Sequence, residues 1–236
     1  MAKTFKVLSA LLSYPSAELQ QAAGELRATL IAEALLPPAA RRGLDRLIGE
    51  IADGDLYDLQ ENYILLFDRT RSLSLHLFEH VHGESRDRGQ AMIDLKSLYE
   101  QKGLALSATE LPDFLPLFLE FLSTLPATEA RELMRQTAHI SVALGQRLEK
   151  RQSAYAAVFA CLAELAGAPL EDAAPVVEED DADPHDLAAL DEAWEDKPVT
   201  FGPEAAGGCR DTLISKIRAG RRPAAGVQSA RGATHG

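Results

Sequence analysis

Apolar residues recur at intervals of three and four along most of the first 167 positions. They form runs such as Leu19, Ala23, Leu26 and Leu30, then Leu44, Leu47, Ile48 and Ile51, and later Ile140, Leu144 and Leu148. This spacing places the apolar side chains on one face of a helix. The alternation typical of a half-buried strand is essentially absent. The pattern therefore predicts an all-α protein, a compact single-domain helical bundle.

Residues 111–126 are apolar on nearly every side, which a helix tolerates only when neighbours surround it. We expect this segment to be the central helix. With Asp113 as its N-cap, Pro116 falls in the first turn, where the missing N–H would have had no partner. The helix is then expected to run to about Leu125 and to stop at Pro126.

The helical periodicity ends at Gly167, so we divide the chain into a folded domain, 1–167, and a low-complexity tail, 168–236. The tail is first acidic and then basic, and its composition cannot bury enough apolar surface to offset chain entropy. We expect it to be largely disordered. Leu187, Leu190 and Trp194 are spaced i, i+3 and i+7, for which we expect transient helicity. A sharper alternative has this trio fold back over an apolar groove and compete with a ligand.

The net charge of −12 belongs to one segment of the chain. Residues 171–196 hold twelve Asp or Glu and no Lys or Arg, whereas the remaining residues hold 24 acids and 24 bases. A balanced helical body has no basic face with which to neutralise phosphates. We therefore expect no nucleic-acid binding.

Membrane insertion and redox chemistry also find no support in the sequence. No apolar run approaches the roughly 20 residues that a bilayer-spanning helix needs. The short apolar run at the N-terminus meets Tyr14 and Pro15 in place of a small-residue cleavage site, so we interpret it as a first helix. Cys161 and Cys209 have no spacing typical of a metal or redox pair, which fits a reducing cytoplasm.

Residues 61–92 are the densest in potential chemistry, with three of the six histidines and four arginines. Residues 76–80 read H-x-x-E-H, the pattern of a zinc protease in which Glu79 would act as the base. A third ligand would have to come from a distant acid such as Glu149 or Glu164. A five-residue pattern is short, and a small bundle leaves little room for a substrate cleft, so a zinc hydrolase is the weaker alternative.

The plain interpretation of these histidines is that they are hydrogen-bonded structural groups at a helix end. Three of them within seven residues, His76, His80 and His82, together with Phe67 and Phe78, also favour a partly apolar, partly polar concave surface. Such a surface suits peptide recognition better than catalysis.

Five motifs carry a resemblance to a known family. They are Leu12-Ser13-Tyr14-Pro15, Tyr63-x-x-Leu66-Phe67-Asp68-Arg69, Ser74-Leu75-His76-Leu77-Phe78-Glu79-His80-Val81-His82-Gly83-Glu84, Arg86-x-Arg88-Gly89-Gln90-Ala91-Met92, and Glu110-Leu111-Pro112-Asp113-x-Leu115-Pro116 with Leu119-Glu120-Phe121-Leu122. In this order, over about residues 5–166, they resemble the nitrate reductase molybdenum cofactor assembly chaperones. This is the NarJ branch of the TorD/DmsD group of redox-enzyme maturation proteins.

The resemblance implies a cytoplasmic, all-helical chaperone that is not an enzyme. It would bind the N-terminal peptide and the apo form of the catalytic (alpha) subunit of respiratory nitrate reductase, and would enable molybdenum cofactor insertion and complex assembly. The cofactor belongs to the client, so the chain needs none of its own. Molybdenum cofactor delivery proteins are further candidate partners. The motifs carry no role onto the tail.

An amphipathic peptide helix in an apolar groove is the binding mode that fits both the residues and the resemblance. The candidate peptide-binding residues are Tyr63, Phe67, His76, Phe78, Glu79, His80, His82, Arg86, Arg88 and Met92. The aromatic residues and Met92 would supply apolar contact, and the charged residues and histidines would line the rim. Histidines would make affinity sensitive to pH near 6 to 7, around their reference pKa of about 6.5. A generic helical adaptor with an unrelated partner remains a second alternative.

Overall fold

The structure, a computed structural model, describes residues 2–82, 86–107 and 110–167, without the side chains of His82 and Arg86. The expectations of a disordered tail and of a transient helix at Leu187, Leu190 and Trp194 lie outside the described residues. The elements are α1 (Lys3–Leu11), α2 (Ala17–Gln21), α3 (Ala23–Glu33), α4 (Pro38–Asp53), α5 (Leu56–Tyr63), the π-helix η1 (Ile64–Asp68), the 3₁₀-helix η2 (Arg71–Leu73), α6 (Leu77–His82), α7 (Arg86–Gln101), α8 (Leu115–Thr124), α9 (Ala127–Gln136), α10 (Ala138–Lys150) and α11 (Ala156–Ala166). The described residues contain helices and no strand, which confirms the all-α prediction.

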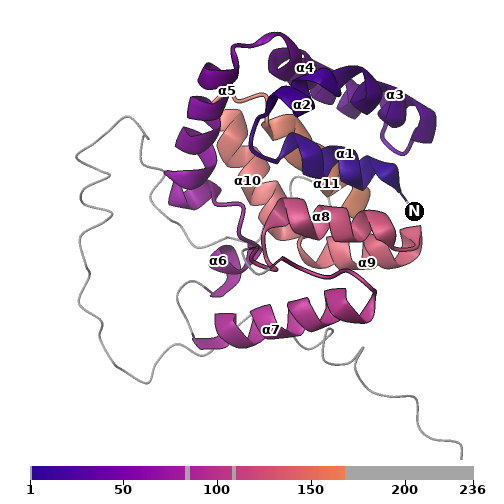
Figure 1. Cartoon of the computed structure of the whole chain (residues 1–236), viewed down its shortest axis with the longest axis vertical. Helices are drawn as coiled ribbons and strands as arrows, with labels where there is room; N and C mark the ends of the chain where they lie inside the picture. Colours follow the sequence, from indigo (N-terminus) through magenta and orange to yellow (C-terminus); the bar gives the residue numbers. More distant parts are fainter. Residues whose placement is uncertain (1, 83–85, 108–109, 168–236) are drawn as a thin grey trace, which may run out of the picture.

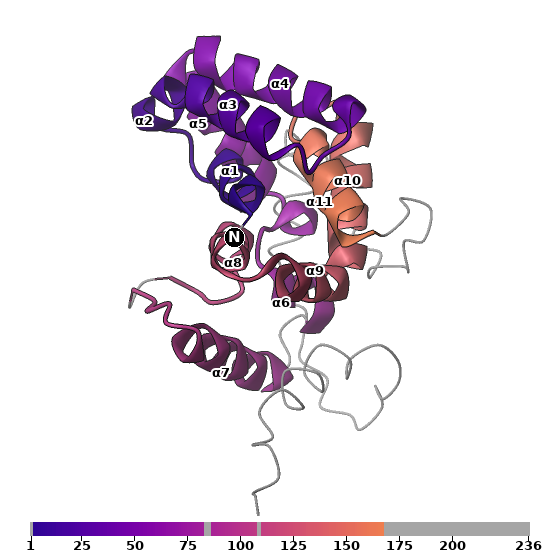
Figure 2. The ribbon, with the colours of Figure 1, turned by 90° about the vertical axis from the view of Figure 1, so that its right-hand side faces the viewer.

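The helices pack in a bundle whose two largest contacts pair α1 with α8 and α10 with α11. Figures 1 and 2 show α8 between α1 and α7, while α2, α3 and α4 cover one end of the bundle. Helix α11 also contacts α4 and α9. One hydrophobic core runs through these contacts.

The apolar segment 111–126 forms α8, and seven of the ten residues of this helix are buried. Its burial is confirmed. Its N-cap is Phe114 with no side-chain hydrogen bond, so the assignment of Asp113 as the cap is wrong. Pro116 does lie in the first turn, and the helix ends at Thr124 with Leu125 as the C-cap, one residue before the expected end. The Asp113 side chain points to another helix, as described below.

Glycine ends two of the helices in the way that the sequence predicts. Gly167 caps α11 in the left-handed conformation, with φ 68°, and Gly103 follows α7 with φ 85°. Glycine adopts this region without the steric cost that a Cβ imposes. Among the described residues, no helix is long and apolar enough to cross a membrane.

Candidate functional site

A buried carboxylate, Asp113, organises the histidine-rich segment. Its side chain is fully buried, and it receives the backbone N–H of Phe78 on Oδ2 at 3.2 Å. His76 Nδ1 lies 3.2 Å from Oδ1, and Arg88 Nη2 lies 3.7 Å from Oδ2. The same guanidinium donates to Glu79 at 3.1 Å. We call these five residues, which come from three separate stretches of the chain, the Asp113 cluster.

Backbone hydrogen bonds fix the same junction. Leu77 N–H donates to the Asp113 carbonyl at 3.0 Å, and Leu115 N–H donates to the Leu75 carbonyl at 2.8 Å. The start of α6 is therefore tied to the start of α8. Asp113 serves as an N-terminal cap for α6 from a distant part of the chain, where a negative charge is favourable beside the free N–H groups.

The histidines of this segment have structural partners. The ring of His76 packs on Phe114, with centroids 5.4 Å apart. His80 Nε2 lies 2.7 Å from the Ser74 carbonyl oxygen, so this nitrogen carries the proton. Burial, together with the nearby His80, lowers the pKa of His139 on α10. His76 and His80 therefore serve as hydrogen-bonded packing groups.

The zinc-hydrolase alternative finds no ligand set in the part of the chain that the structure describes. No group of three His, Cys, Asp or Glu residues there is close enough to hold a metal. Glu79, the residue that would act as the base, is paired with Arg88 instead. The H-x-x-E-H spacing is met in the sequence, but its carboxylate is used to join α6 to α7.

The three predicted aromatic residues lie in the core rather than on a surface. Phe78 is 1% exposed, and Tyr63 and Phe67 are also buried. Tyr63 donates its hydroxyl proton to the Leu12 carbonyl at 2.7 Å and contacts Phe67, with ring centroids 5.0 Å apart. Each ring is packed against neighbouring helices in this conformation, and a direct contact of the three rings with a peptide stays a prediction. Tyr155 on the far side completes the packing around Phe67.

The remaining predicted residues are distributed around α6 and α7. Met92 is partly buried and lines a groove of about 220 Å³ together with Ile93, Lys96, Leu106, Ser107, Glu110 and Pro112. The side chains of His82 and Arg86 lie outside the described residues. His76, Glu79 and Arg88 gather around Asp113, with His80 beside them on α6. A role of the ten residues in peptide binding stays a prediction.

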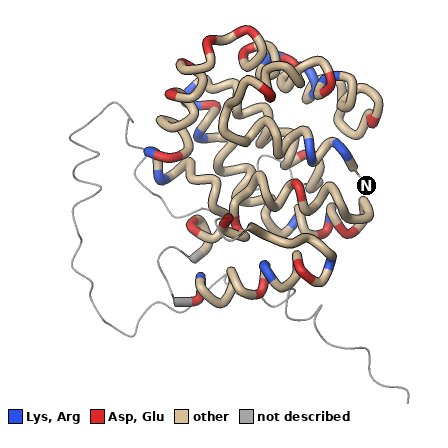
Figure 3. Tube along the Cα trace, in the orientation of Figure 1, with Lys and Arg blue, Asp and Glu red and all other residues tan. Residues whose placement is uncertain are grey.

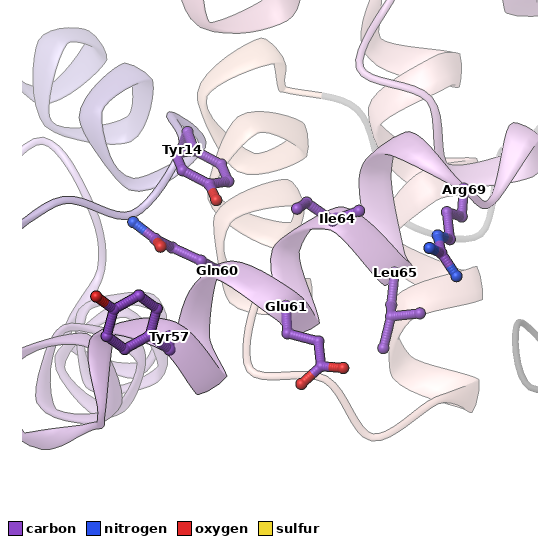
Figure 4. A pocket seen from close by; sticks show the side chains of 7 residues that line it. All are labelled: Tyr14, Tyr57, Gln60, Glu61, Ile64, Leu65 and Arg69. Carbon is purple, nitrogen blue, oxygen red and sulfur yellow. The ribbon is translucent and has the colours of Figure 1, made fainter.

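A larger groove runs along the outer face of α5 and η1. Figure 4 shows its lining, and its volume is about 290 Å³. The lining residues are Tyr14, Tyr57, Gln60, Glu61, Ile64, Leu65 and Arg69. Tyr57 is 80% exposed and Tyr14 is 48% exposed, so much of this lining is aromatic surface open to solvent. We call this feature the α5 groove.

Local structure holds the α5 groove in place. Asp55 caps α5 by accepting the backbone N–H groups of Tyr57 and Asp58, at 2.9 and 3.3 Å. Gln60 Nε2 donates to the Pro15 carbonyl at 2.8 Å, which fixes the turn that carries Tyr14. The ring of Tyr14 meets the buried ring of Tyr63 edge to face, with centroids 5.6 Å apart. The exposed aromatic surface therefore rests on the core.

The floor of the groove contains a π-turn. After α5 the chain continues into η1, where the Arg69 N–H donates to the Ile64 carbonyl at 2.9 Å, five residues back. Such turns are frequent at functional sites because the extra residue re-aims the side chains that follow it. The apolar spacing of residues 56–67 is that of an ordinary amphipathic α-helix and does not indicate this turn. The signal in the sequence is Tyr57 on α5 and Leu65 on η1, two large apolar residues that do not belong to the buried core.

The charge around the groove is one-sided. Residues 47–68 contain six carboxylates and no Lys or Arg. Asp55, Asp58 and Glu61 are exposed on α5, and Arg69 lies at the opposite end of the groove. Elsewhere acids and bases are interspersed over the described body, as Figure 3 shows, so no basic face is present there.

Comparison with known proteins shows the relationships of the chain. The model of the family described as nitrate reductase delta subunit matches residues 15–161. The chain belongs to this family. It is 44% identical over 211 residues, 89% of this chain and 88% of the relative, to the nitrate reductase molybdenum cofactor assembly chaperone NarJ of Escherichia coli strain K12. It is 38% identical to the probable chaperone NarW of the same strain, over 90% of each chain, and 34% identical to the probable NarJ of Bacillus subtilis strain 168, over 65% of this chain and 82% of that relative.

Membership of this family confirms the resemblance drawn from the motifs. The relatives are named as assembly chaperones and not as enzymes, in agreement with the prediction of a protein without catalytic activity. The family match includes all ten predicted residues and the α5 groove except Tyr14. The 211 matched residues outnumber the 167 that precede the tail, so the similarity extends beyond the stretch 5–166 that the motifs span.

Proposed function

We propose that the chain is an assembly chaperone that binds the N-terminal peptide and the apo form of the catalytic subunit of respiratory nitrate reductase. Binding would hold the subunit until molybdenum cofactor is inserted and the complex assembles. Family membership and the names of the relatives support the client. The resemblance of the motifs supports the peptide and a cytoplasmic place of action.

The observation that carries the peptide proposal is the α5 groove. It is an open furrow with apolar and aromatic lining, and such furrows bind amphipathic helices through anchors at i, i+3, i+4 and i+7. Its lining residues follow one another from Tyr57 on α5 to Arg69 after η1, so the groove runs lengthwise along these two helices. The exposed acids of α5 favour a partner with basic residues beside its apolar face.

The Asp113 cluster has a supporting role in this proposal. It fixes the relative position of α6, α7 and α8, and Pro112, the residue before Asp113, lines the groove beside Met92. His82, with which α6 ends, and Arg86, with which α7 begins, remain candidates for a second contact with the apo subunit. Molybdenum cofactor delivery proteins would approach the client, which holds the cofactor site.

The experiment is a binding titration of a dye-labelled N-terminal peptide from the cognate catalytic subunit. Fluorescence anisotropy of the dye reports binding, with a scrambled peptide of the same composition as the control. A dye is needed because the one tryptophan of the chain, Trp194, lies in the tail. We expect saturable binding of the native peptide and at least tenfold weaker binding of the scrambled one, a difference of about 1.4 kcal/mol or more. Equal binding of both peptides would favour the generic adaptor.

A further inference from the structure

The α5 groove sets two requirements on any segment that fills it. The lining offers exposed aromatic surface at Tyr14 and Tyr57, together with the half-buried Leu65. The flank on α5 offers the carboxylates of Asp58 and Glu61, and the one base in the lining, Arg69, lies at the other end of the groove. An occupant must therefore be apolar on one side and basic beside it, because like charges placed opposite each other are unfavourable.

The tail of the chain contains two apolar motifs that differ in charge. Leu187, Leu190 and Trp194 lie in residues 186–196, which hold five acids and no base. A second motif occurs at residues 210–222, RDTLISKIRAGRR, with five bases and one acid. Its apolar residues, Leu213, Ile214 and Ile217, are spaced i, i+1 and i+4, so they share one side when the segment is helical.

Charge separates these two motifs as occupants of the groove. The acidic motif would bring its five carboxylates against those of α5, whereas the basic motif would bring Lys216 and Arg218 against them. The basic motif also satisfies the apolar requirement. It is the part of the tail that matches the chemistry of the groove on both counts.

The linker is long enough for the basic motif to reach the groove. Forty-five residues separate Gly167, the cap of α11, from Leu213. A flexible chain of this length has an end-to-end distance of roughly 35–40 Å. A domain of the size of residues 1–167 has a radius of gyration of about 15 Å, so every face of the bundle lies within that distance.

We propose that residues 211–222 of the tail dock in the α5 groove, with Leu213, Ile214 and Ile217 on its apolar lining and Lys216 and Arg218 beside Asp58 and Glu61. The tail is then an internal occupant of the surface to which we assign the client peptide. Tethering gives it an effective concentration in the millimolar range, so even a weak contact is populated. The tail covers the groove while no client is bound, and the client displaces the tail when it binds.

A spin label on the native chain tests docking without any client. Cys209 lies next to the docking segment, and Cys161 is fully buried with burial raising its pKa to about 12, so a thiol reagent modifies Cys209 selectively. We expect a nitroxide at Cys209 to broaden the amide signals of residues 57–65 and to leave those of α3 sharp. Broadening elsewhere, or broadening of α3 and α5 alike, would overturn the proposal.

Charge reversal tests the assigned contacts. The double variant Lys216→Glu, Arg218→Glu should abolish the broadening on α5, whereas Lys197→Glu, Arg231→Glu, with the same change in net charge outside residues 210–222, should retain it. Combining the double variant with Asp58→Lys, Glu61→Lys should restore it. Broadening that persists in the first variant contradicts the proposal. Mixing the labelled chain with an isotope-enriched Cys209→Ser chain detects docking between copies, which would also contradict it.

The effect on the client rests on the proposed function and is measured separately. If the tail and the client peptide share the groove, Lys216→Glu, Arg218→Glu should bind the labelled client peptide about twofold or more tighter than the native chain, since an equally populated internal competitor halves the affinity. If the native chain shows broadening on α5 but the double variant binds the peptide with unchanged affinity, the tail docks in the groove and the client peptide binds elsewhere. Peptide binding without broadening would retain the proposed function and reject the docked tail.

Discussion

The Asp113 cluster and the α5 groove use their side chains in opposite ways. In the cluster, a fully buried carboxylate is surrounded by the guanidinium of Arg88, the imidazole of His76 and the backbone N–H of Phe78. In the groove, Tyr14 and Tyr57 expose aromatic surface that no described residue covers. The polar groups of the Asp113 cluster are hydrogen-bonded to one another within the protein, whereas the α5 groove leaves aromatic surface exposed.

This difference teaches that chemical density is a poor guide to a binding surface in a helical protein. Polar groups that lie inside a bundle need partners there, because an unpaired buried charge is costly. A cluster of histidines, arginines and carboxylates can therefore have a purely structural role, because each buried polar group needs a partner. Neighbouring aromatic residues that are exposed together have no such structural explanation, and large apolar patches of this kind are typical of docking sites.

The largest expected effect comes from removing the centre of the cluster. Asp113→Ala leaves the Phe78 N–H without its acceptor and Arg88 without a buried counter-charge, so we expect a loss of about 3 kcal/mol in the free energy of unfolding. Urea titration followed by circular dichroism measures it. Asp45→Ala is the matched control, since its ion pair with Arg27 is partly exposed and should cost less than about 1 kcal/mol. Equal losses in the two variants would show that Asp113 does not organise the junction.

The sequence predicts the fold well because helix periodicity and helix stops are local properties. The burial of α8 follows from its apolar residues on every side, and the end of α11 follows from Gly167. Assigning Asp113 as the cap of α8 was also a local argument, and it failed for that reason. The carboxylate caps α6 instead, whose Phe78 lies 35 positions earlier in the chain.

The candidate site is less predictable because burial depends on partners distant in sequence. Tyr57 and Tyr63 lie on the same short helix, and their identity alone does not tell which of them faces the core. Contact with Tyr155, more than 90 positions away, places the ring of Tyr63 inside. The acidic flank of α5 could have been read from residues 47–68, since they contain carboxylates and no base.

Removing aromatic surface from the groove should weaken client binding without unfolding the protein. Tyr57→Ala deletes an 80% exposed aromatic ring and leaves the charge of the groove unchanged, so we expect about tenfold weaker binding of the client peptide, the size of a moderate hot spot. Ile31→Ala on α3 is the matched control, because Ile31 is a similarly exposed apolar residue, at 66%, and does not line the groove. Anisotropy titration compares them. If both variants bind like the native chain, the client uses another surface, and the groove beside Met92 becomes the next to test.

Removing the hydroxyl groups of Tyr63 and Tyr155, one at a time, compares a hydrogen-bonded buried hydroxyl with one that is unpaired within the described chain, beneath the groove. Tyr63 donates to the Leu12 carbonyl at 2.7 Å, so Tyr63→Phe should cost about 1 kcal/mol of unfolding free energy and leave a buried acceptor unpaired. The hydroxyl of Tyr155 is buried without a partner among the described residues, so Tyr155→Phe should be neutral or slightly stabilising. Urea midpoints of the two variants give the difference. A loss in Tyr155→Phe as large as that in Tyr63→Phe would reveal a partner for Tyr155.

The smallest expected effect is the contribution of His139 to the pH dependence of the free energy of unfolding. Burial and the neighbouring His80 lower the pKa of His139 below its usual value of 6.5, so the unfolded chain takes up a proton first as the pH falls. Neutral His139 therefore contributes fully to the free energy of unfolding above about pH 6.5. This contribution declines below that pH, because protonation favours the unfolded chain. His139→Gln should flatten the decrease in unfolding free energy between pH 7.5 and pH 5.5, a range in which ordinary carboxylates stay ionised. An unchanged slope would mean that His139 titrates alike in the folded and unfolded chains, and that the two imidazoles do not repel each other across the junction of α6 and α10.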